Sequence, residues 1–305
     1  MTDGLSLLFP TFPMRTPEFS AARVPGLAPV LERWRARAAD VVPLSADTFA
    51  VPHPTVLQSS LPETLQAHYA TVIEGVAMGE WVEARLGPAH SAAGYSMGLY
   101  SALAHSGALP FEDVLRLVTH VCEAAHAQTP PGVWAVGAIV GLIPEAVRAL
   151  ADSHGLEITD RYGSTTWLVT GRRDPVVTAL DAALAQGAPA TRLLPLTAPF
   201  HASVLSSLES SLQSLVQSVR WTAPHMPIVS AITLEPLDDG AAIAAEVVRN
   251  AAHPMDWYGT IQRLIALGGR TFVECGASTS LADIIREDFA MLGLGRDFRS
   301  FESES

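Results

Sequence analysis

The ten residues from Gly94 to Leu103 read GYSMGLYSAL, and they decide how the rest of the chain is interpreted. The first five fit the pattern G-x-S-x-G, in which a serine stands on a strained turn between a strand and a helix. Small residues two positions before and after the serine let the flanking backbone pass closely. The helix that begins at Met97 would aim its first N–H groups at Ser96, where an oxyanion could form. The stretch therefore predicts a strand–turn–helix unit of an α/β fold, with Ser96 as a candidate nucleophile.

Helical patterns dominate the chain on both sides of this turn. Apolar residues recur at helical spacing over residues 63–86, 99–107 and 111–127. The stretch before about residue 60 is rich in proline, and we expect it to be irregular apart from a helix over 31–39.

The middle of the chain has a different pattern. An apolar, β-like segment is followed by a helix, two short strands, a second helix and a last strand, at residues 133–142, 144–154, 156–162, 165–170, 175–186 and 192–196. We expect Asp174 to cap the second helix. This β-α-β-β-α-β order is that of the ferredoxin-like, split βαβ unit.

After this unit the α/β alternation returns, because helical patterns at 257–267 and 279–289 flank a strand at 272–274. We therefore expect a hydrolase-like α/β large domain formed by residues 1–128 and 198–305. A ferredoxin-like (βαββαβ) small subdomain, residues 129–197, would be inserted between its two parts.

Composition narrows the class of protein. Of the 305 residues, 49% are hydrophobic and 16% are charged, which is typical of a globular protein with a sizeable core and excludes disorder. No apolar run is long enough to span a membrane. The N-terminal residues lack a basic stretch ahead of an apolar one, so we expect no signal peptide and a cytoplasmic protein. The two cysteines, Cys122 and Cys275, provide neither a disulfide framework nor a metal-ligand cluster.

The charge of the chain restricts its partners. A net charge of −12 disfavours nucleic acid and anionic membranes. The chain contains no lysine, so Schiff-base chemistry and a phosphate-binding P-loop lysine are excluded. An acidic partner would need a local patch of arginines.

A serine nucleophile needs a general base, and histidine is the usual one. His201 is the strongest candidate, because it follows the last strand of the small unit and Pro199 fixes the chain just before it. His253, in an Ala-His-Pro stretch, is the rival candidate. His120 and His126 lie together on one predicted helix.

Taken in order, several motifs resemble the malonyl-CoA:acyl carrier protein transacylases and the related acyltransferase domains of polyketide synthases. The run 94–103 is similar to that family's GHSxGEYxAL, and the segment from Leu193 to His201 is similar to the strand leading to its catalytic histidine. Further similar segments are 107–109, 116–118, 137–142, 253–257 and 274–276. The resemblance covers nearly the whole chain and implies a ping-pong acyltransferase.

The resemblance implies roles for individual residues. Ser96 would attack an acyl thioester with His201 as its base, and the backbone carbonyl of His253 would hold the second imidazole nitrogen of His201. The backbone N–H groups of Met97 and Phe12 would form the oxyanion hole. The acyl group would pass from CoA or a carrier-protein thioester, through a serine ester, to the phosphopantetheine thiol of an acyl carrier protein. The resemblance implies no bound cofactor and no metal.

The expected acyl pocket departs from the family's pattern. Gln66 aligns with the family's pocket glutamine, Tyr95 replaces the histidine before the serine, and Phe200 precedes His201. Val121 stands where malonyl-specific members have the arginine that pairs with the substrate's carboxylate. Without that arginine, we expect an acyl group that lacks a free carboxylate.

Other functions stay open at this stage. The same residues suit a hydrolase of acyl-CoA or acyl-carrier-protein thioesters, ordinary malonyl transfer, or an inactive relative. An ordinary α/β-hydrolase esterase would use Ser96, His253 and an acid such as Asp174, but the chain has no HGGG segment. A carrier-protein-binding module without catalysis is the alternative outside the enzymes.

An acidic carrier protein requires local positive charge on this acidic chain. The candidate docking residues are Arg192, Arg172, Arg173 and Arg286. Arg192 stands where the resembled family has a basic residue before the last strand of the small subdomain. The expected partners are an acyl carrier protein and acyl-CoA, and a monomer is compatible with the sequence.

Overall fold

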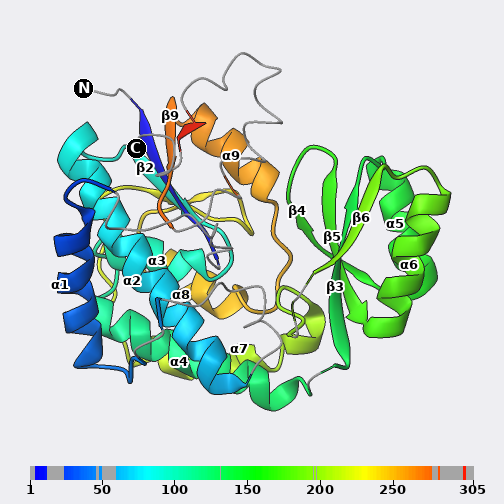
Figure 1. Ribbon diagram of the computed structural model, residues 1–305, viewed down its shortest axis with the longest axis horizontal. Helices are drawn as coiled ribbons and strands as arrows, with labels where there is room; N and C mark the ends of the chain where they lie inside the picture. The colour runs from blue at the N-terminus through cyan, green and yellow to red at the C-terminus, as the bar shows by residue number, and fades with distance from the viewer. Residues whose placement is uncertain are drawn as a thin grey trace.

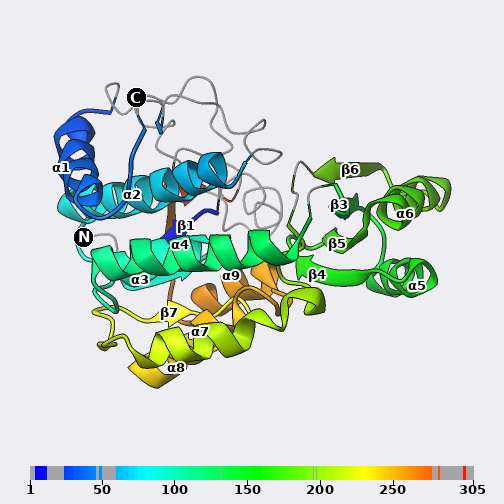
Figure 2. The same cartoon turned by 90° about the horizontal axis from the view of Figure 1, so that it is seen from below.

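Two separate β-sheets organise the molecule in a computed structural model of the chain (Figure 1). The structure describes residues 4–11, 24–45, 48–49, 60–130, 132–194, 196, 198–276 and 281, together with the backbone of 298–299. A six-stranded sheet with helices around it forms a large α/β domain, and a four-stranded sheet with two helices stands beside it (Figures 1 and 2). This is the α/β class with an additional small subdomain that the sequence predicts.

The large sheet is mostly parallel and is built from distant parts of the chain. Its strand order is β10-β9-β1-β2-β7-β8, and only β8 runs antiparallel to its neighbour. Its strands are β1 (Leu5–Phe9), β2 (Ser91–Gly94), β7 (Ile228–Val229), β8 (Pro236–Leu237), β9 (Thr271–Glu274) and β10 (Phe298–Arg299). The central strands β1 and β2 are buried along their whole length, because helices cover a parallel sheet on both faces.

The prediction of an irregular N-terminal stretch is wrong for β1, which lies between β2 and β9 in the middle of the large sheet. The strand reads LSLLF and shows no regular alternation, because a central parallel strand is buried on both faces. The proline-rich stretch starts directly after it, at Pro10. The two-residue strands β7 and β8 are too short to show a periodicity, and the sequence does not predict them.

The helices around the large sheet correspond well to the predicted helical segments in the first half of the chain. They are α1 (Leu27–Ala39), α2 (Leu61–Leu86), α3 (Gly98–His105), α4 (Phe111–Gln128), α7 (Leu208–Gln217), α8 (Gly240–Arg249) and α9 (Trp257–Ala266), with a 3₁₀ turn at Ser203–Leu205. A capping box formed by Ser60 and Glu63 starts α2. None of the helices that the structure describes is long and apolar enough to cross a membrane.

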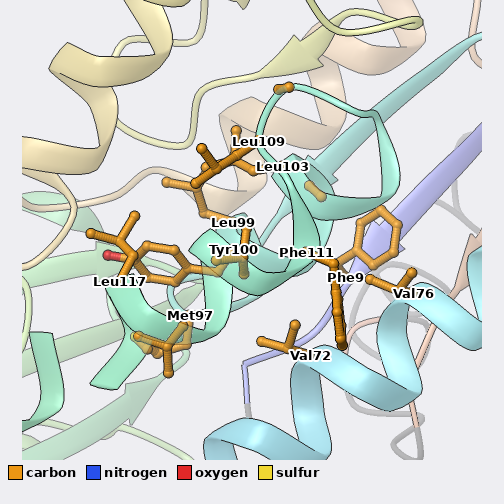
Figure 3. Packing of buried hydrophobic residues seen from close by; sticks show 14 of the residues in the cluster. Phe9, Val72, Val76, Met97, Leu99, Tyr100, Leu103, Leu109, Phe111 and Leu117 are labelled. Atoms are coloured by element: carbon orange, nitrogen blue, oxygen red, sulfur yellow. The ribbon is translucent and has the colours of Figure 1, made fainter. Parts of the chain in front are cut away.

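The core next to the predicted nucleophile forms where α3 packs against α2, α4 and β1. Figure 3 shows Phe9 of β1, Val72 and Val76 of α2, and Leu99 and Leu103 of α3 in one cluster of buried side chains. Burying each such side chain stabilises the fold by roughly 1.5–3 kcal/mol relative to leaving it exposed. This packing fixes the N-terminal end of α3, which follows Ser96.

The small sheet is antiparallel and comes from one continuous part of the chain, with strand order β4-β5-β3-β6. Its elements are β3 (Trp134–Val140), α5 (Pro144–His154), β4 (Glu157–Arg161), β5 (Thr166–Arg172), α6 (Arg173–Ala185) and β6 (Ala190–Leu194). The two helices lie on one face of the sheet (Figure 1). The βαββαβ order is the predicted one, although α6 begins at Arg173, so that Asp174 lies in its first turn instead of capping it. The limits 129–197 of a separate subdomain stay a prediction.

The edge strand β4 of the small sheet also contacts the large domain, through the segment that precedes α9. Asp160 forms a parallel bridge with Met255. The N–H of Arg161 donates to the Met255 carbonyl at 3.2 Å, and the N–H of Met255 donates to the Thr159 carbonyl at 3.0 Å. Backbone hydrogen bonds therefore fix β4 beside the large domain.

Candidate active site

Ser96 stands on the turn between β2 and α3 in a left-handed backbone conformation, with φ 54°. A Cβ atom at Gly94 would overlap the backbone of Gly98 and Leu99, and one at Gly98 would overlap the carbonyl of Phe9. Glycine is therefore required at both positions by close backbone approach. This is the geometry that the G-x-S-x-G pattern predicts, and it presents the serine hydroxyl at the carboxyl end of β2.

The side chain of His201 lies directly opposite this hydroxyl. Ser96 Oγ and His201 Nε2 are 2.7 Å apart, and His201 Nδ1 is 3.2 Å from the backbone carbonyl of His253. A carbonyl can only accept, so Nδ1 carries the proton and Nε2 is free to accept the serine proton. His201 also has a left-handed backbone, with φ 65°, and its N–H donates to the Ala251 carbonyl at 2.8 Å. Two non-glycine residues in this sparsely populated region face each other, as is common at functional sites.

Burial sets the protonation state of the imidazole. It lowers the pKa of His201 to about 4, against the opposing effect of the hydrogen bond to His253. His201 is only 7% exposed, so the charged form is poorly solvated. The imidazole is therefore neutral near pH 7, which a general base requires.

At the start of α3, some backbone N–H groups already donate to carbonyl groups, whereas one is available to a ligand. Those of Gly98, Leu99 and Tyr100 donate to the carbonyls of Tyr95, Ser96 and Met97. Among the described residues, none accepts from the N–H of Met97. Its predicted role as an oxyanion donor is thus compatible with the structure, whereas the other predicted donor, Phe12, lies outside the described residues.

Asn250, at the C-terminal end of α8, is a contact that the sequence analysis does not predict. Its side-chain N–H donates to the backbone carbonyl of Ser96 at 3.2 Å, and the residue is 5% exposed. This hydrogen bond ties the strained turn to the segment that carries His253. The nearest signal in the sequence is its position three residues before His253, and that does not reveal the contact.

A cleft of about 500 Å³, part of it open to solvent, lies between the two sheets and contains Ser96 and His201. The large domain contributes Met97, Phe200 and Met255 to its walls, and the small sheet contributes Val136, Thr159, Asp160 and Leu168. Most of these side chains are apolar, and none of the described lining residues is an arginine.

The predicted pocket residues separate into two groups. Tyr95 and Phe200 line the cleft. Val121 lies on the buried face of α4, is 1% exposed and packs in the core of the large domain, and it is not among the residues that line the cleft. Gln66 accepts from the N–H of Ser45 at 2.9 Å and donates to the Pro43 carbonyl at 2.7 Å, so it holds the loop after α1. A pocket role for Val121 and Gln66 stays a prediction.

Tyr95 makes a side-chain hydrogen bond between the two walls of the cleft. Its hydroxyl donates to Asp160 Oδ2 at 2.7 Å, and the Trp257 N–H donates to Oδ1 at 3.3 Å. Burial raises the pKa of Asp160 to about 7, although these hydrogen bonds oppose the shift. The sequence analysis does not single out Asp160.

The rival histidines do not reach the serine. The imidazole of His253 pairs with Glu209, with Nε2 and Oε1 3.1 Å apart, so only its backbone serves His201. His120 and His126 lie on α4 and do not line the cleft. Asp174 is exposed on α6, and the esterase triad of Ser96, His253 and Asp174 does not assemble.

One group of side chains in the described part of the chain has the composition of a metal site. Ligand atoms of Glu83, His105 and His225 lie within 4.8 Å of one another. Glu83 Oε2 and His105 Nε2 are already 3.1 Å apart, as in an ion pair. His105 ends α3, at the opposite end of that helix from Ser96, so this group takes no part in the chemistry of the cleft.

The predicted docking arginines are on the surface of the small sheet. Arg172, Arg173 and Arg192 are exposed, and the Arg172 guanidinium lies 5.9 Å from the centre of the Trp134 ring. Arg286 lies outside the described residues. A docking role for all of them stays a prediction.

No protein-family model matches the chain. Among curated proteins, it is 30% identical over 195 residues to the polyketide biosynthesis protein ThaF of Burkholderia thailandensis, an alignment that covers 64% of this chain and 17% of that protein. It is 26% identical over 198 residues to the malonyl CoA-acyl carrier protein transacylase of Escherichia coli, covering 64% of each chain. The chain therefore spans less than two thirds of the length of these relatives.

Solved structures have the same fold over nearly the whole chain. The acyl-carrier-protein S-malonyltransferase of Burkholderia pseudomallei superposes with a TM-score of 0.84 at 24% identity, covering 97% of this chain and 95% of that one. A type II polyketide synthase acyl-carrier protein in complex with its malonyl-transacylase gives 0.83 at 22% identity, covering 97% and 94%. The chain has the fold of these transacylases.

Proposed function

We propose that this chain, a relative of the malonyl CoA-acyl carrier protein transacylases, is an acyltransferase that forms an acyl ester on Ser96 and passes the acyl group to an acyl carrier protein. The observation that carries the proposal is the 2.7 Å contact between Ser96 Oγ and His201 Nε2 on a strained turn at the start of a helix. A neutral imidazole, oriented by a carbonyl, is what such a nucleophile requires.

In the first half-reaction, Ser96 Oγ attacks the carbonyl carbon of a thioester while His201 Nε2 accepts the hydroxyl proton. The carbonyl oxygen becomes an oxyanion, and the Met97 N–H is placed to donate to it. One such donor contributes on the order of 3 kcal/mol. When the intermediate collapses, the C–S bond breaks, the imidazolium returns the proton to the leaving thiolate, and an ester remains on Ser96.

In the second half-reaction the neutral imidazole accepts the proton of the carrier protein's phosphopantetheine thiol. The sulfur attacks the ester carbonyl, the C–O bond to Ser96 breaks, and the proton returns to Oγ. No bound cofactor takes part in this sequence. If water replaced the thiol, the same residues would release a free acid, and this is the hydrolase alternative.

The acyl group that we propose lacks a free carboxylate. Val121 stands where the family resemblance leads us to expect an arginine in malonyl-specific relatives, and the described lining of the cleft contains no arginine. The walls next to Ser96 are mainly apolar, as Val136, Leu168 and Phe200 illustrate. Acetyl, propionyl or longer neutral acyl groups would lose little by desolvation in such a cleft, whereas a carboxylate would lose its water without gaining a bidentate partner.

Intact-protein mass spectrometry tests this function. The protein is incubated separately with propionyl-, octanoyl- and malonyl-CoA, and the mass shift on Ser96 is located by peptide mapping. We expect an adduct from a neutral donor, none on Ser96→Ala, and an unchanged adduct on Ser210→Ala, a serine of α7 far along the chain. Transfer is then followed by adding a phosphopantetheinylated acyl carrier protein.

The outcomes distinguish the alternatives. Movement of the acyl mass to the carrier protein supports transfer, and release as free acid at the same rate with and without the carrier protein supports hydrolysis. Preferential labelling of Ser96 by malonyl-CoA would support the alternative of ordinary malonyl transfer. Absence of any adduct, from CoA and carrier-protein donors alike, would refute the enzymatic function.

A further inference from the structure

Asp160 is the one carboxylic acid among the described residues that line the cleft. It is held at the wall by Tyr95, whose backbone directly precedes the nucleophile, and by the Trp257 N–H. Both contacts come from the large domain, so they fix the carboxyl group of this β4 residue against it. The charge of this group therefore acts on whatever acyl group is attached to Ser96.

Within the described part of the chain, none of the ion pairs includes Asp160, which is 1% exposed. The neighbouring side chain of Arg161 points elsewhere, because its guanidinium carbon lies 4.5 Å from the centre of the Tyr258 ring and 5.6 Å from that of Trp167. An ionised Asp160 thus leaves a net negative charge in an apolar wall, where screening by water is weak.

Like charges at close range in such surroundings repel strongly, even without direct contact. A malonyl group esterified to Ser96 would carry its own carboxylate into the same cleft. An ionised Asp160 has the opposite charge to the arginine of malonyl-specific relatives. The cleft therefore repels an acidic acyl group, in addition to offering it no cationic partner.

We propose that Asp160 is a specificity-determining residue, which excludes acyl groups that bear a carboxylate and thereby restricts the cleft to neutral acyl groups. This inference rests on the proposed acyltransferase function. Tyr95 acts as a positioning residue, because its hydroxyl donates to the carboxylate and holds it at the wall of the cleft.

A change of pH alters the charge of Asp160 without a substitution, provided that the groups around it keep theirs. The groups that face it are the phenol of Tyr95 from the turn and the carboxylate of Asp256 from the segment before α9, besides the hydrogen bond from the Trp257 backbone. Burial keeps the pKa of Tyr95 well above its usual range, so Tyr95 stays neutral in the working range of pH. Around neutral pH Asp160 therefore changes charge, whereas Tyr95 does not.

The test measures loading of Ser96 by malonyl-CoA relative to propionyl-CoA, at equal concentrations, in the wild-type chain and in Asp160→Asn. An asparagine keeps an acceptor for Tyr95 and removes the charge. At pH 8 we expect the malonyl-to-propionyl ratio to rise at least about tenfold in Asp160→Asn. Asp181→Asn is the matched control, since that aspartate is exposed on α6 and does not line the cleft, and the malonyl-to-propionyl ratio of this variant should stay at the wild-type value.

The pH dependence of the wild-type chain tests the same point without a variant. With a pKa of about 7, Asp160 changes from mostly ionised at pH 8 to mostly neutral at pH 6. The malonyl-to-propionyl ratio should therefore rise about tenfold as the pH falls from 8 to 6, and it should stay flat in Asp160→Asn. Both donors carry the same CoA, so titration of its phosphates cancels in the ratio.

The results separate this inference from the function on which it rests. Propionyl loading of Ser96 together with a ratio that neither Asp160→Asn nor pH alters would overturn the role of Asp160 and leave the acyltransferase intact. Failure of every donor to load Ser96 would refute the function, and the inference would fall with it. If Asp160→Asn does not fold, the pH dependence of the malonyl-to-propionyl ratio in the wild-type chain still tests the role of Asp160.

Discussion

The two walls of the cleft contribute different things. The wall from the large domain carries Ser96, which is half-buried, and His201, which is buried; both are strained in backbone, and their side chains are 2.7 Å apart. The described part of the wall from the small sheet carries apolar side chains such as Val136 and Leu168, the hydroxyl of Thr159 and one carboxylic acid, Asp160. We therefore call the wall with Ser96 and His201 the reacting wall and the wall with Asp160 the selecting wall. Because the groups that carry out acyl transfer and the group that selects the acyl chain come from separate sheets, one set can change while the other is retained.

The largest effect should come from the reacting wall. We expect His201→Gln to lower the rate of propionyl loading of Ser96 by about 10²–10⁴-fold, because the serine loses its general base. The rate is measured by quenched-flow mass spectrometry. His126→Gln, an exposed histidine of α4, should load at the wild-type rate. A His201→Gln variant that loads as fast as the control would contradict the role of His201 as the general base for Ser96.

The pH dependence of loading should follow His201 and not Asp160 when the donor is neutral. The pKa of His201 is lowered to about 4, so its imidazole stays an acceptor down to about pH 5 and is protonated as the pH falls through 4. Propionyl loading should be flat from pH 8 to 5 and fall about tenfold per unit below pH 4. A short exposure to each pH followed by quenching measures this, and full activity on return to pH 7 shows that the chain stayed folded. A loss of rate centred near pH 6.5 would contradict the buried, neutral histidine.

Removal of the hydroxyl that joins the walls should affect stability. We expect Tyr95→Phe to lower the free energy of unfolding by about 1–3 kcal/mol, because it leaves the buried carboxylate of Asp160 with one hydrogen bond fewer. Urea unfolding at pH 8 measures the change. In an Asp160→Asn background the same substitution should cost less, because the acceptor is then uncharged, and equal losses in both backgrounds would mean that the hydrogen bond contributes no coupling between the walls.

The smallest effect should lie outside the cleft. Arg192→Glu should raise the KM for an acyl carrier protein a few-fold and leave the loading of Ser96 from propionyl-CoA unchanged. A charge at the rim of an interface affects the rate of association more than the stability of the complex. Arg148→Glu, on the exposed side of α5, is the matched control. A loss in both half-reactions would show that Arg192 acts on the cleft and does not contact the carrier protein.

The reacting wall was largely predictable because its signals are local. Five residues around Ser96 specify the turn, and the helix after it follows from apolar spacing. His201 is distant in sequence, and its choice over His253 depended on its position at a strand end and on the family resemblance. Asn250, which donates to the Ser96 carbonyl across 154 positions, had no local signal at all.

The selecting wall was predictable in its strand order but not in its side chains. A β-bulge between Ile158 and Asp160 breaks the alternation of β4, so that Thr159 and Asp160 are both buried. A regular strand would have buried only one of them, and an aspartate is usually exposed. The partner of Asp160, Tyr95, is 65 positions away on another sheet, and sequence spacing does not reveal such a contact.

The central position of β1 has a consequence for how the chain folds during synthesis. β1 is synthesised before both of its neighbours in the sheet, and one of them, β9, is complete only after residues 271–274 have been added. All strands of the small sheet, by contrast, are available once residue 194 has been made. Domains generally fold as units as they emerge from the ribosome, and pairings between distant segments form late. Until β9 has been made, one edge of the apolar LSLLF segment has no partner strand, and an unpaired apolar strand edge favours aggregation.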